Sequence, residues 1–215
     1  MTGRGSLHAG LAAAFCLLAG CAAAPMDYTE FRLHQPRSIL VLPPLNESTA
    51  VEATYGVLST VTMPLAEMGY YVYPVAVMDR FLKENGMPTA GEMHQVPLDK
   101  VREIVSADAV LYITVRQYGT KYLLIDSVTT VQSTARLVDT QTGATLWAGQ
   151  GGAAQRAGGS GNLIADAIAA AVTQIINTAT DRAHDVARYA NINLLTIEDT
   201  GLLFGPYHPR SGTGR

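Results

Sequence analysis

Residues 108–115, with the sequence DAVLYITV, decide the fold predicted for this chain. Their β-branched and aromatic side chains favour a strand that is buried in the sheet. A second apolar run, SILVL at 38–42, ends at Pro43 and Pro44, which cannot continue a hydrogen-bonded ladder. A third strand is expected at 70–75. Helices are expected between and around these strands, at residues 51–68, 77–84 and 98–105.

The pattern changes to polar–apolar alternation after this strand. Residues 122–139 alternate, a turn follows at 140–143, and 144–149 (ATLWAG) returns, which predicts an antiparallel hairpin. The Gly-, Ala- and Ser-rich residues 150–161 predict a mobile loop, and a long C-terminal helix is expected over 162–191. We therefore predict a single α/β domain over 37–204, with one sheet that is parallel at first and antiparallel later.

The first 20 residues have the features of a signal peptide. Arg4 precedes an apolar run from Leu7 to Gly20, which is shorter than the ~20 residues that a membrane-spanning helix needs. At its end, four residues resemble the bacterial lipobox: Leu18, Ala19, Gly20 and Cys21. This resemblance implies cleavage before Cys21, and a lipidated Cys21 with an acylated (palmitate-type) amino terminus as the membrane anchor. The alternative is an ordinary signal peptide whose cysteine is incidental.

The segments on either side of the domain are predicted to be irregular. Residues 21–36 lack a sustained period and contain two prolines, so we expect a mostly extended, lipidated tether. The polar, Gly- and Pro-containing residues 205–215 are expected to be a disordered tail. Both cysteines, Cys16 and Cys21, lie in or beside the signal, so no disulfide is expected in the mature body.

Composition and motifs give no sign of catalysis. The chain is 48% hydrophobic and 15% charged, with a formal net charge of −3, which fits a globular body and gives no reason to expect nucleic acid as a partner. The five histidines are scattered, with no pair at helical metal-site spacing, so no catalytic centre, metal site or cofactor is predicted. We expect a protein that is not an enzyme.

Aromatic residues are the candidates for a contact surface. Tyr70, Tyr71 and Tyr73, together with Trp147, either wrap the core or, where exposed, form a surface for a partner. The second interpretation is open because Tyr and Trp are enriched at the centres of protein interfaces.

Three segments carry a family resemblance: SILVLPPLN at 38–46, SADAVLYITV at 106–115 and LVDTQTGATLW at 137–147. Their order resembles the amino-terminal domain of TolB and the periplasmic domain of the curli channel CsgG. With the lipobox and residues 64–82, the chain from Cys21 to Leu203 resembles a family of bacterial outer-membrane lipoproteins of unknown function, first noted as antigens in Neisseria.

The family resemblance implies a location and a role. Such proteins are lipid-anchored in the outer membrane, and Ala22 in place of Asp after the lipobox cysteine fits that location. We expect a body that faces the periplasm and acts through protein contacts, as an accessory part of an envelope or secretion-associated assembly beside a CsgG-like lipoprotein, with a homo-oligomer left open. The alternative is a periplasmic ligand-binding protein or hydrolase that uses a crevice at the strand ends.

Overall fold

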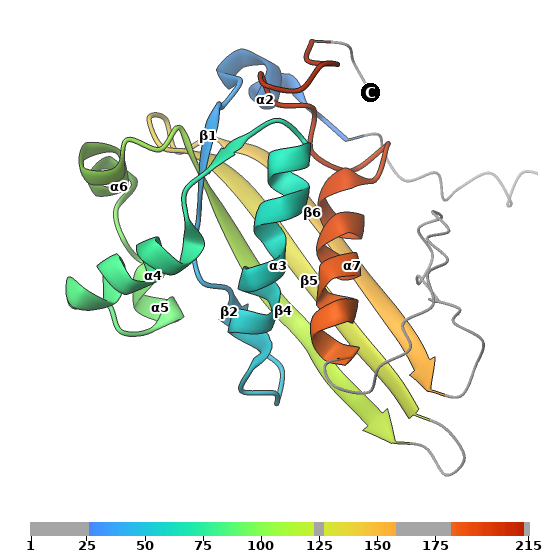
Figure 1. The fold of residues 1–215 in the computed structure, drawn as a ribbon. Coiled ribbons are helices and arrows are strands. Elements are labelled where there is room, and N and C mark those ends of the chain that lie inside the picture. The colour runs from blue at the N-terminus through green and yellow to red at the C-terminus, as the bar shows by residue number, and fades with distance from the viewer. Residues whose placement is uncertain (1–25, 123–126, 158–181, 213–215) are drawn as a thin grey trace, which may run out of the picture.

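The computed structural model describes residues 26–122, 127–157 and 182–212 of the chain. The described strands form one six-stranded mixed sheet in the order β3-β1-β4-β5-β6, with β2 also paired to β4 (Figure 1). The parallel part is β1 (Ser38–Val41), β2 (Leu45–Asn46), β3 (Tyr71–Val72) and β4 (Ala109–Tyr122). The antiparallel part adds β5 (Ser127–Asp139) and β6 (Thr145–Ala157) to β4. The predicted mixed α/β domain is confirmed.

Helices cover the two faces of this sheet unequally. The described helices are α2 (Thr29–His34), α3 (Ala53–Glu67), α4 (Val75–Glu84), α5 (Ala90–Met93), α6 (Leu98–Val105) and α7 (Arg182–Thr196). Helices α3 and α7 pack on one face, where they enclose the larger core with residues such as Leu111 and Ile113 of β4. A smaller core on the other face joins α4, α5 and α6 to Leu40, Leu42 and Val110.

Polar side chains fix the starts of β1 and β4 and the turn between β5 and β6. The Asp108 carboxylate accepts hydrogen bonds from the backbone N–H groups of Arg37 (2.9 Å) and Ser38 (3.0 Å), and the Ser38 hydroxyl accepts one from the Asp108 N–H. The starts of β1 and β4 are thereby fixed side by side. At the predicted hairpin turn, Asp139 accepts from the N–H groups of Gln141 and Thr142, and Gly143 closes the turn with a φ of 74°.

The prediction of a mobile loop at 150–161 is wrong for residues 150–157, which form the second half of β6, and residues 158–161 lie outside the described residues. Glycine is required there by packing: a Cβ at Gly151 would lie 2.4 Å from the Leu194 Cα of α7, and one at Gly149 would lie 2.2 Å from the Trp147 ring. Low side-chain volume therefore allows a helix and an indole to approach this strand. The expected helix at 162–191 is described only from Arg182, and it continues to Thr196; its earlier part lies outside the described residues.

The segments expected to be irregular also differ from prediction. Residues 29–34 of the predicted extended tether form α2, because Phe31 is buried in the larger core. The predicted disordered tail packs against the body as far as it is described: the Gly205 N–H donates to the Met68 carbonyl (2.8 Å) and the Tyr207 N–H to the Gly69 carbonyl (3.2 Å). In addition, Phe204 stacks on His208.

Within the described ranges, the helices are all too short or too polar to cross a bilayer.

Candidate functional site

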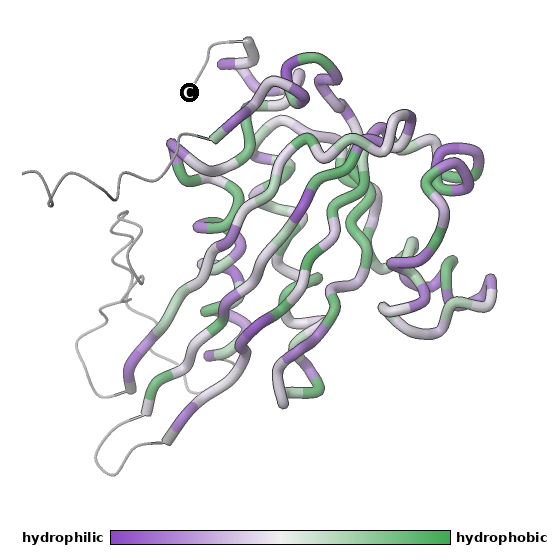
Figure 2. The backbone as a smooth tube through the Cα atoms, turned by 180° about the vertical axis from the view of Figure 1, so that it is seen from behind, coloured by the Kyte–Doolittle hydropathy of each residue, from purple (hydrophilic) through white to green (hydrophobic). Residues whose placement is uncertain are grey.

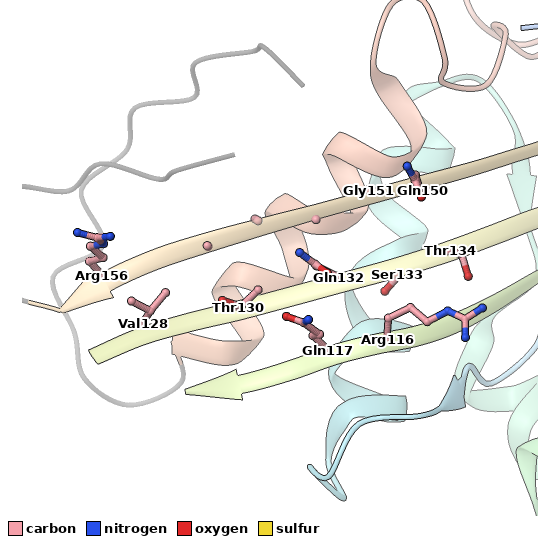
Figure 3. A pocket seen from close by; sticks show the side chains of 13 residues that line it. Arg116, Gln117, Val128, Thr130, Gln132, Ser133, Thr134, Gln150, Gly151 and Arg156 are labelled. Atoms are coloured by element: carbon pink, nitrogen blue, oxygen red, sulfur yellow. The ribbon is translucent and has the colours of Figure 1, made fainter. Parts of the chain in front are cut away.

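The second halves of β4 and β6 and the first half of β5, which lie side by side, present a surface that no described helix covers. Figure 2 shows these strands uncovered when the molecule is viewed from behind, and Figure 3 shows their outward side chains on the side away from α3 and α7. The surface is concave, with a volume of about 560 Å³. We call it the open sheet face and define it by the polar residues that line it: Arg116, Gln117, Thr130, Gln132, Thr134, Gln150 and Arg156.

The strand pattern places a set of positive charges on the open sheet face. Arg116 and Arg156 line the concavity. Lys121 pairs across the ladder with Val128, which also lines it, and directly opposed residues point to the same side of a sheet. Arg136 follows Thr134 on β5 at the two-residue period of a strand. The sequences of β4, β5 and β6 contain only one acidic residue, Asp139, which is buried in the hairpin turn.

Neighbouring groups hold two of these arginines in place. Arg116 forms an ion pair with Glu47, just after β2, and both side chains are about half exposed (51% and 52%). The Arg136 guanidinium lies 4.1 Å from the centre of the Tyr112 ring, a cation–π contact. Burial raises the pKa of the Tyr112 phenol, and the Arg136 charge opposes that rise. The guanidinium groups of Arg116 and Arg136 thus contribute positive charge to the open sheet face from fixed positions.

The chemistry of this surface suits binding. The residues that line the concavity offer amides, hydroxyls and guanidinium groups, and they include no Asp, Glu, His or Cys that could act as a general base or covalent nucleophile. Across the described residues, no group of three His, Cys, Asp or Glu side chains is placed to hold a metal ion.

The sequence-predicted aromatic residues do not form one surface. Trp147 is buried (2% exposed), and its Nε1–H donates to the Thr200 carbonyl at 2.8 Å. Tyr70 is also buried, and its hydroxyl donates to the Leu203 carbonyl. The Tyr73 hydroxyl donates to the Val105 carbonyl (2.9 Å), and burial raises its pKa. Only Tyr71 of these four is well exposed (52%), with its ring against that of Tyr73. Core packing is therefore the correct interpretation for Tyr70 and Trp147.

The predicted lipidation site cannot be located in the structure. Cys21 and the preceding Leu18, Ala19 and Gly20 lie outside the described residues. Their assignment stays a prediction.

Sequence reasoning missed the open sheet face, although part of the signal was present. The alternation of 128–136 places Thr130, Gln132 and Thr134 on one side, with Arg136 in line. The same period continues through Gln150, Gly152, Ala154 and Arg156 of β6. It was not recognised because the glycines and alanines between them have low strand propensity.

Comparison with known proteins settles the family. A family model described as "Putative lipoprotein GNA1162-like" matches residues 26–207. The chain belongs to the GNA1162-like lipoprotein family. Its similarity to "Putative lipoprotein NMB1124/NMB1162" of Neisseria meningitidis serogroup B is 46% identity over 182 residues, which covers 84% of this chain and 85% of the relative.

Two solved structures are also similar to this chain. The crystal structure of lipoprotein GNA1162 from Neisseria meningitidis matches with a TM-score of 0.55 and 50% identity, over 58% of this chain and 87% of that chain. A PelC dodecamer structure from Paraburkholderia phytofirmans matches with a TM-score of 0.45 and 15% identity, over 78% and 91% of the two chains. The likeness to TolB and CsgG stays a prediction.

The GNA1162-like match includes the whole open sheet face, because β4, β5 and β6 lie within residues 26–207. It begins after Cys21, so it leaves the lipobox untested.

Proposed function

We propose that this GNA1162-like chain is an outer-membrane lipoprotein, anchored through Cys21 and facing the periplasm, that acts through protein contacts in an envelope or secretion-associated assembly. The observation that carries the proposal is the open sheet face, a concave cationic surface without a described helix over it. We assign this surface to a partner with an acidic contact face, and a CsgG-like lipoprotein is the partner class that the sequence resemblance suggests.

Charge is the reason to prefer an acidic partner. The chain carries a formal net charge of −3, yet β4, β5 and β6 place Arg116, Lys121, Arg136 and Arg156 on one surface. Complementary charge steers association and selects the partner more than it adds affinity, and salt weakens it. The neutral amides of Gln117, Gln132 and Gln150 then supply hydrogen bonds in the contact.

Photo-crosslinking in intact envelopes tests this assignment. A photoreactive amino acid at Gln132, in the middle of the open sheet face, is expected to give an adduct with an identified envelope protein. The charge reversals Lys121→Glu and Arg156→Glu together should remove that adduct. The matched control reverses Arg80 and Arg102, which are exposed on α4 and α6 and change the net charge equally; it should leave the adduct intact.

Two results would overturn the assignment. An adduct that survives the reversal of Lys121 and Arg156 would mean that charge on this surface does not select the partner. An adduct with a second copy of the chain would assign the open sheet face to self-association in place of an accessory role.

A second candidate function, ligand binding, is favoured by the size of the concavity. A volume of about 560 Å³ lies within the range of small-molecule sites, about 300–1,000 Å³. The concavity lies along β4, β5 and β6 and not in the expected crevice at the strand ends, where Leu42, Pro43 and Pro44 after β1 are buried. Citrate and inorganic phosphate are suitable probes. A thermal stabilisation by either that the Lys121 and Arg156 reversals abolish would support this candidate.

A further inference from the structure

Helix α2 fastens the start of the described chain to the body. The Phe31 side chain is 3% exposed in the larger core, and the Tyr28 hydroxyl donates to the Gly201 carbonyl. His34 lies 3.5 Å from the Asp139 carboxylate. The chain is therefore held from about residue 28 onward, and the predicted tether of 21–36 loses most of its reach.

The remaining connection to the proposed lipid is short. Only residues 22–25 lie between Cys21 and Met26. A fully extended chain spans at most about 3.6 Å per residue, so these two positions are at most about 18 Å apart. A short linker keeps the folded body close to its acyl anchor. The body is therefore present at the bilayer surface at a high effective concentration.

The end of the molecule that carries α2 also carries residues 203–212. Figures 1 and 2 both show these two segments together, at the end opposite the free tips of β4 and β5. A groove of about 280 Å³ lies between them, with Phe31, Leu203, Phe204 and Pro206 in its lining. Both segments expose a large apolar or aromatic side chain to solvent: Leu33 is 72% exposed and Tyr207 is 67% exposed.

The polar groups at this end are compatible with phospholipid headgroups. Arg32, Arg37 and Arg210 are exposed there, and guanidinium groups bind phosphate through paired hydrogen bonds. Asp27 and Glu30 are exposed at the same end, so its net charge is small. The apolar and aromatic contacts, and not bulk charge attraction, are therefore expected to dominate.

We propose that the end formed by α2 and residues 203–212 rests on the phospholipid bilayer, with Leu33 and Tyr207 at the level of the headgroups. This inference rests on the proposed anchor at Cys21. Tyrosine is enriched at this level of a membrane because its ring is apolar while its hydroxyl stays wet. The short tether raises the effective concentration of both side chains at the bilayer surface.

This orientation has a consequence for the open sheet face. Strand β4 has 14 residues and spans about 45 Å at ~3.3 Å per residue. Its far half, with Arg116 and Lys121, then projects away from the bilayer, where a periplasmic partner can reach it.

Depth-dependent quenching tests the orientation in the native lipidated protein. Cys16 and Cys21 are the only cysteines, so after signal cleavage and acylation a cysteine introduced at Leu33 or Tyr207 is the one reactive thiol. Each variant is labelled with a nitrobenzoxadiazole dye and reconstituted in phosphatidylethanolamine–phosphatidylglycerol vesicles that contain a headgroup nitroxide. The control is Val51→Cys, because Val51 is 91% exposed and lies two residues before α3, which begins at the opposite end of the molecule (Figure 1).

The expected result is severalfold stronger quenching for Leu33→Cys and Tyr207→Cys than for Val51→Cys. Equal quenching at all three positions would overturn the proposed orientation. Mass spectrometry before labelling separates this failure from a failure of the anchor. A chain that carries the lipid but shows equal quenching refutes only the orientation, whereas an unlipidated Cys21 that takes up dye refutes the anchor and the inference with it.

Discussion

The two faces of β5 and β6 have opposite requirements, although their residues alternate along the same strands. On the covered face, Gly149, Gly151 and Ala153 allow the Trp147 ring and α7 to approach the backbone. On the open face, Gln132, Gln150 and Arg156 extend into a concavity. The covered face needs small residues at these positions, whereas the open face carries long polar side chains. Substitutions at adjacent positions of one strand should therefore have very different effects.

Gly151→Val is expected to have the largest effect on stability. A Cβ at Gly151 would lie 2.4 Å from the Leu194 Cα and 2.5 Å from its backbone nitrogen, so the overlap is with backbone atoms that cannot rotate away. Separating α7 from β6 should cost about 3 kcal/mol or more in the free energy of unfolding. Urea denaturation, followed by the emission of the single, buried Trp147, measures this loss.

The matched control is Ala154→Val, on the open face of the same strand. Ala154 lines the concavity, and valine has a higher strand propensity than alanine, so we expect a change within about 0.5 kcal/mol. Equal destabilisation by the two substitutions would show that the strand, and not the face, sets the cost.

The same glycines show where sequence reasoning succeeds and where it fails. Residues 109–115 were predicted as a strand because their own side chains favour one, and the α6 range 98–105 agrees with its apolar spacing. Residues 150–157 have the composition of a loop because their strand is stabilised by its neighbours: β5 supplies the ladder, and α7 supplies the cover that makes glycine necessary. A single-sequence pattern contains no term for a partner that lies 40 residues away.

The candidate site was hidden for a related reason. Lys121 and Arg156 become neighbours of Val128 only through the register of three strands. The sequence places these charges about 35 residues apart, on β4 and β6, with the whole of β5 between them. In contrast, α2 was missed because its anchoring depends on one side chain, Phe31, and on contacts of Tyr28 and His34 with distant residues.

The layer that covers the sheet contains a polar contact with an intermediate expected effect. Asn191 of α7 is 1% exposed, and its Nδ2 donates to the Val57 carbonyl and the Thr60 hydroxyl of α3, both at 2.9 Å. Asn191→Ala should therefore lower the free energy of unfolding by about 2 kcal/mol, because two buried hydrogen bonds and their packing are lost. Chemical denaturation measures the change.

Asn193→Ala provides the comparison within the same helix. The Asn193 Nδ2 donates to the Gly152 carbonyl of β6 at 2.9 Å, and its side chain is only partly buried. We expect a smaller cost, about 1 kcal/mol. If Asn193→Ala were the more damaging substitution, the α3–α7 contact would not be the main polar bond of the covering layer.

The smallest expected effect is a pH dependence at the border of the open face. His94, at the end of α5, donates to the Pro43 carbonyl and lies edge-on to the Tyr112 ring, with Arg136 on that same ring. Burial lowers the pKa of His94, and the Arg136 charge lowers it further against the opposing hydrogen bond to Pro43. Below about pH 6.5 the unfolded chain takes up a proton at His94, while the folded protein resists protonation there. Folding stability therefore decreases as the pH is lowered through this range.

His94→Gln should make this part of the pH dependence disappear, because glutamine does not titrate in this range and its amide can still donate to Pro43. The urea midpoints of the wild type and the variant, compared at pH 7.5 and pH 5.5, measure the difference. Arg136→Gln sharpens the test: it removes one cause of the lowered His94 pKa and leaves burial in place, so the slope should shrink without vanishing. Identical slopes in the wild type and His94→Gln would contradict the assignment. A reduced slope in Arg136→Gln would mean that the Arg136 charge on the open sheet face influences the protonation of His94 at its border.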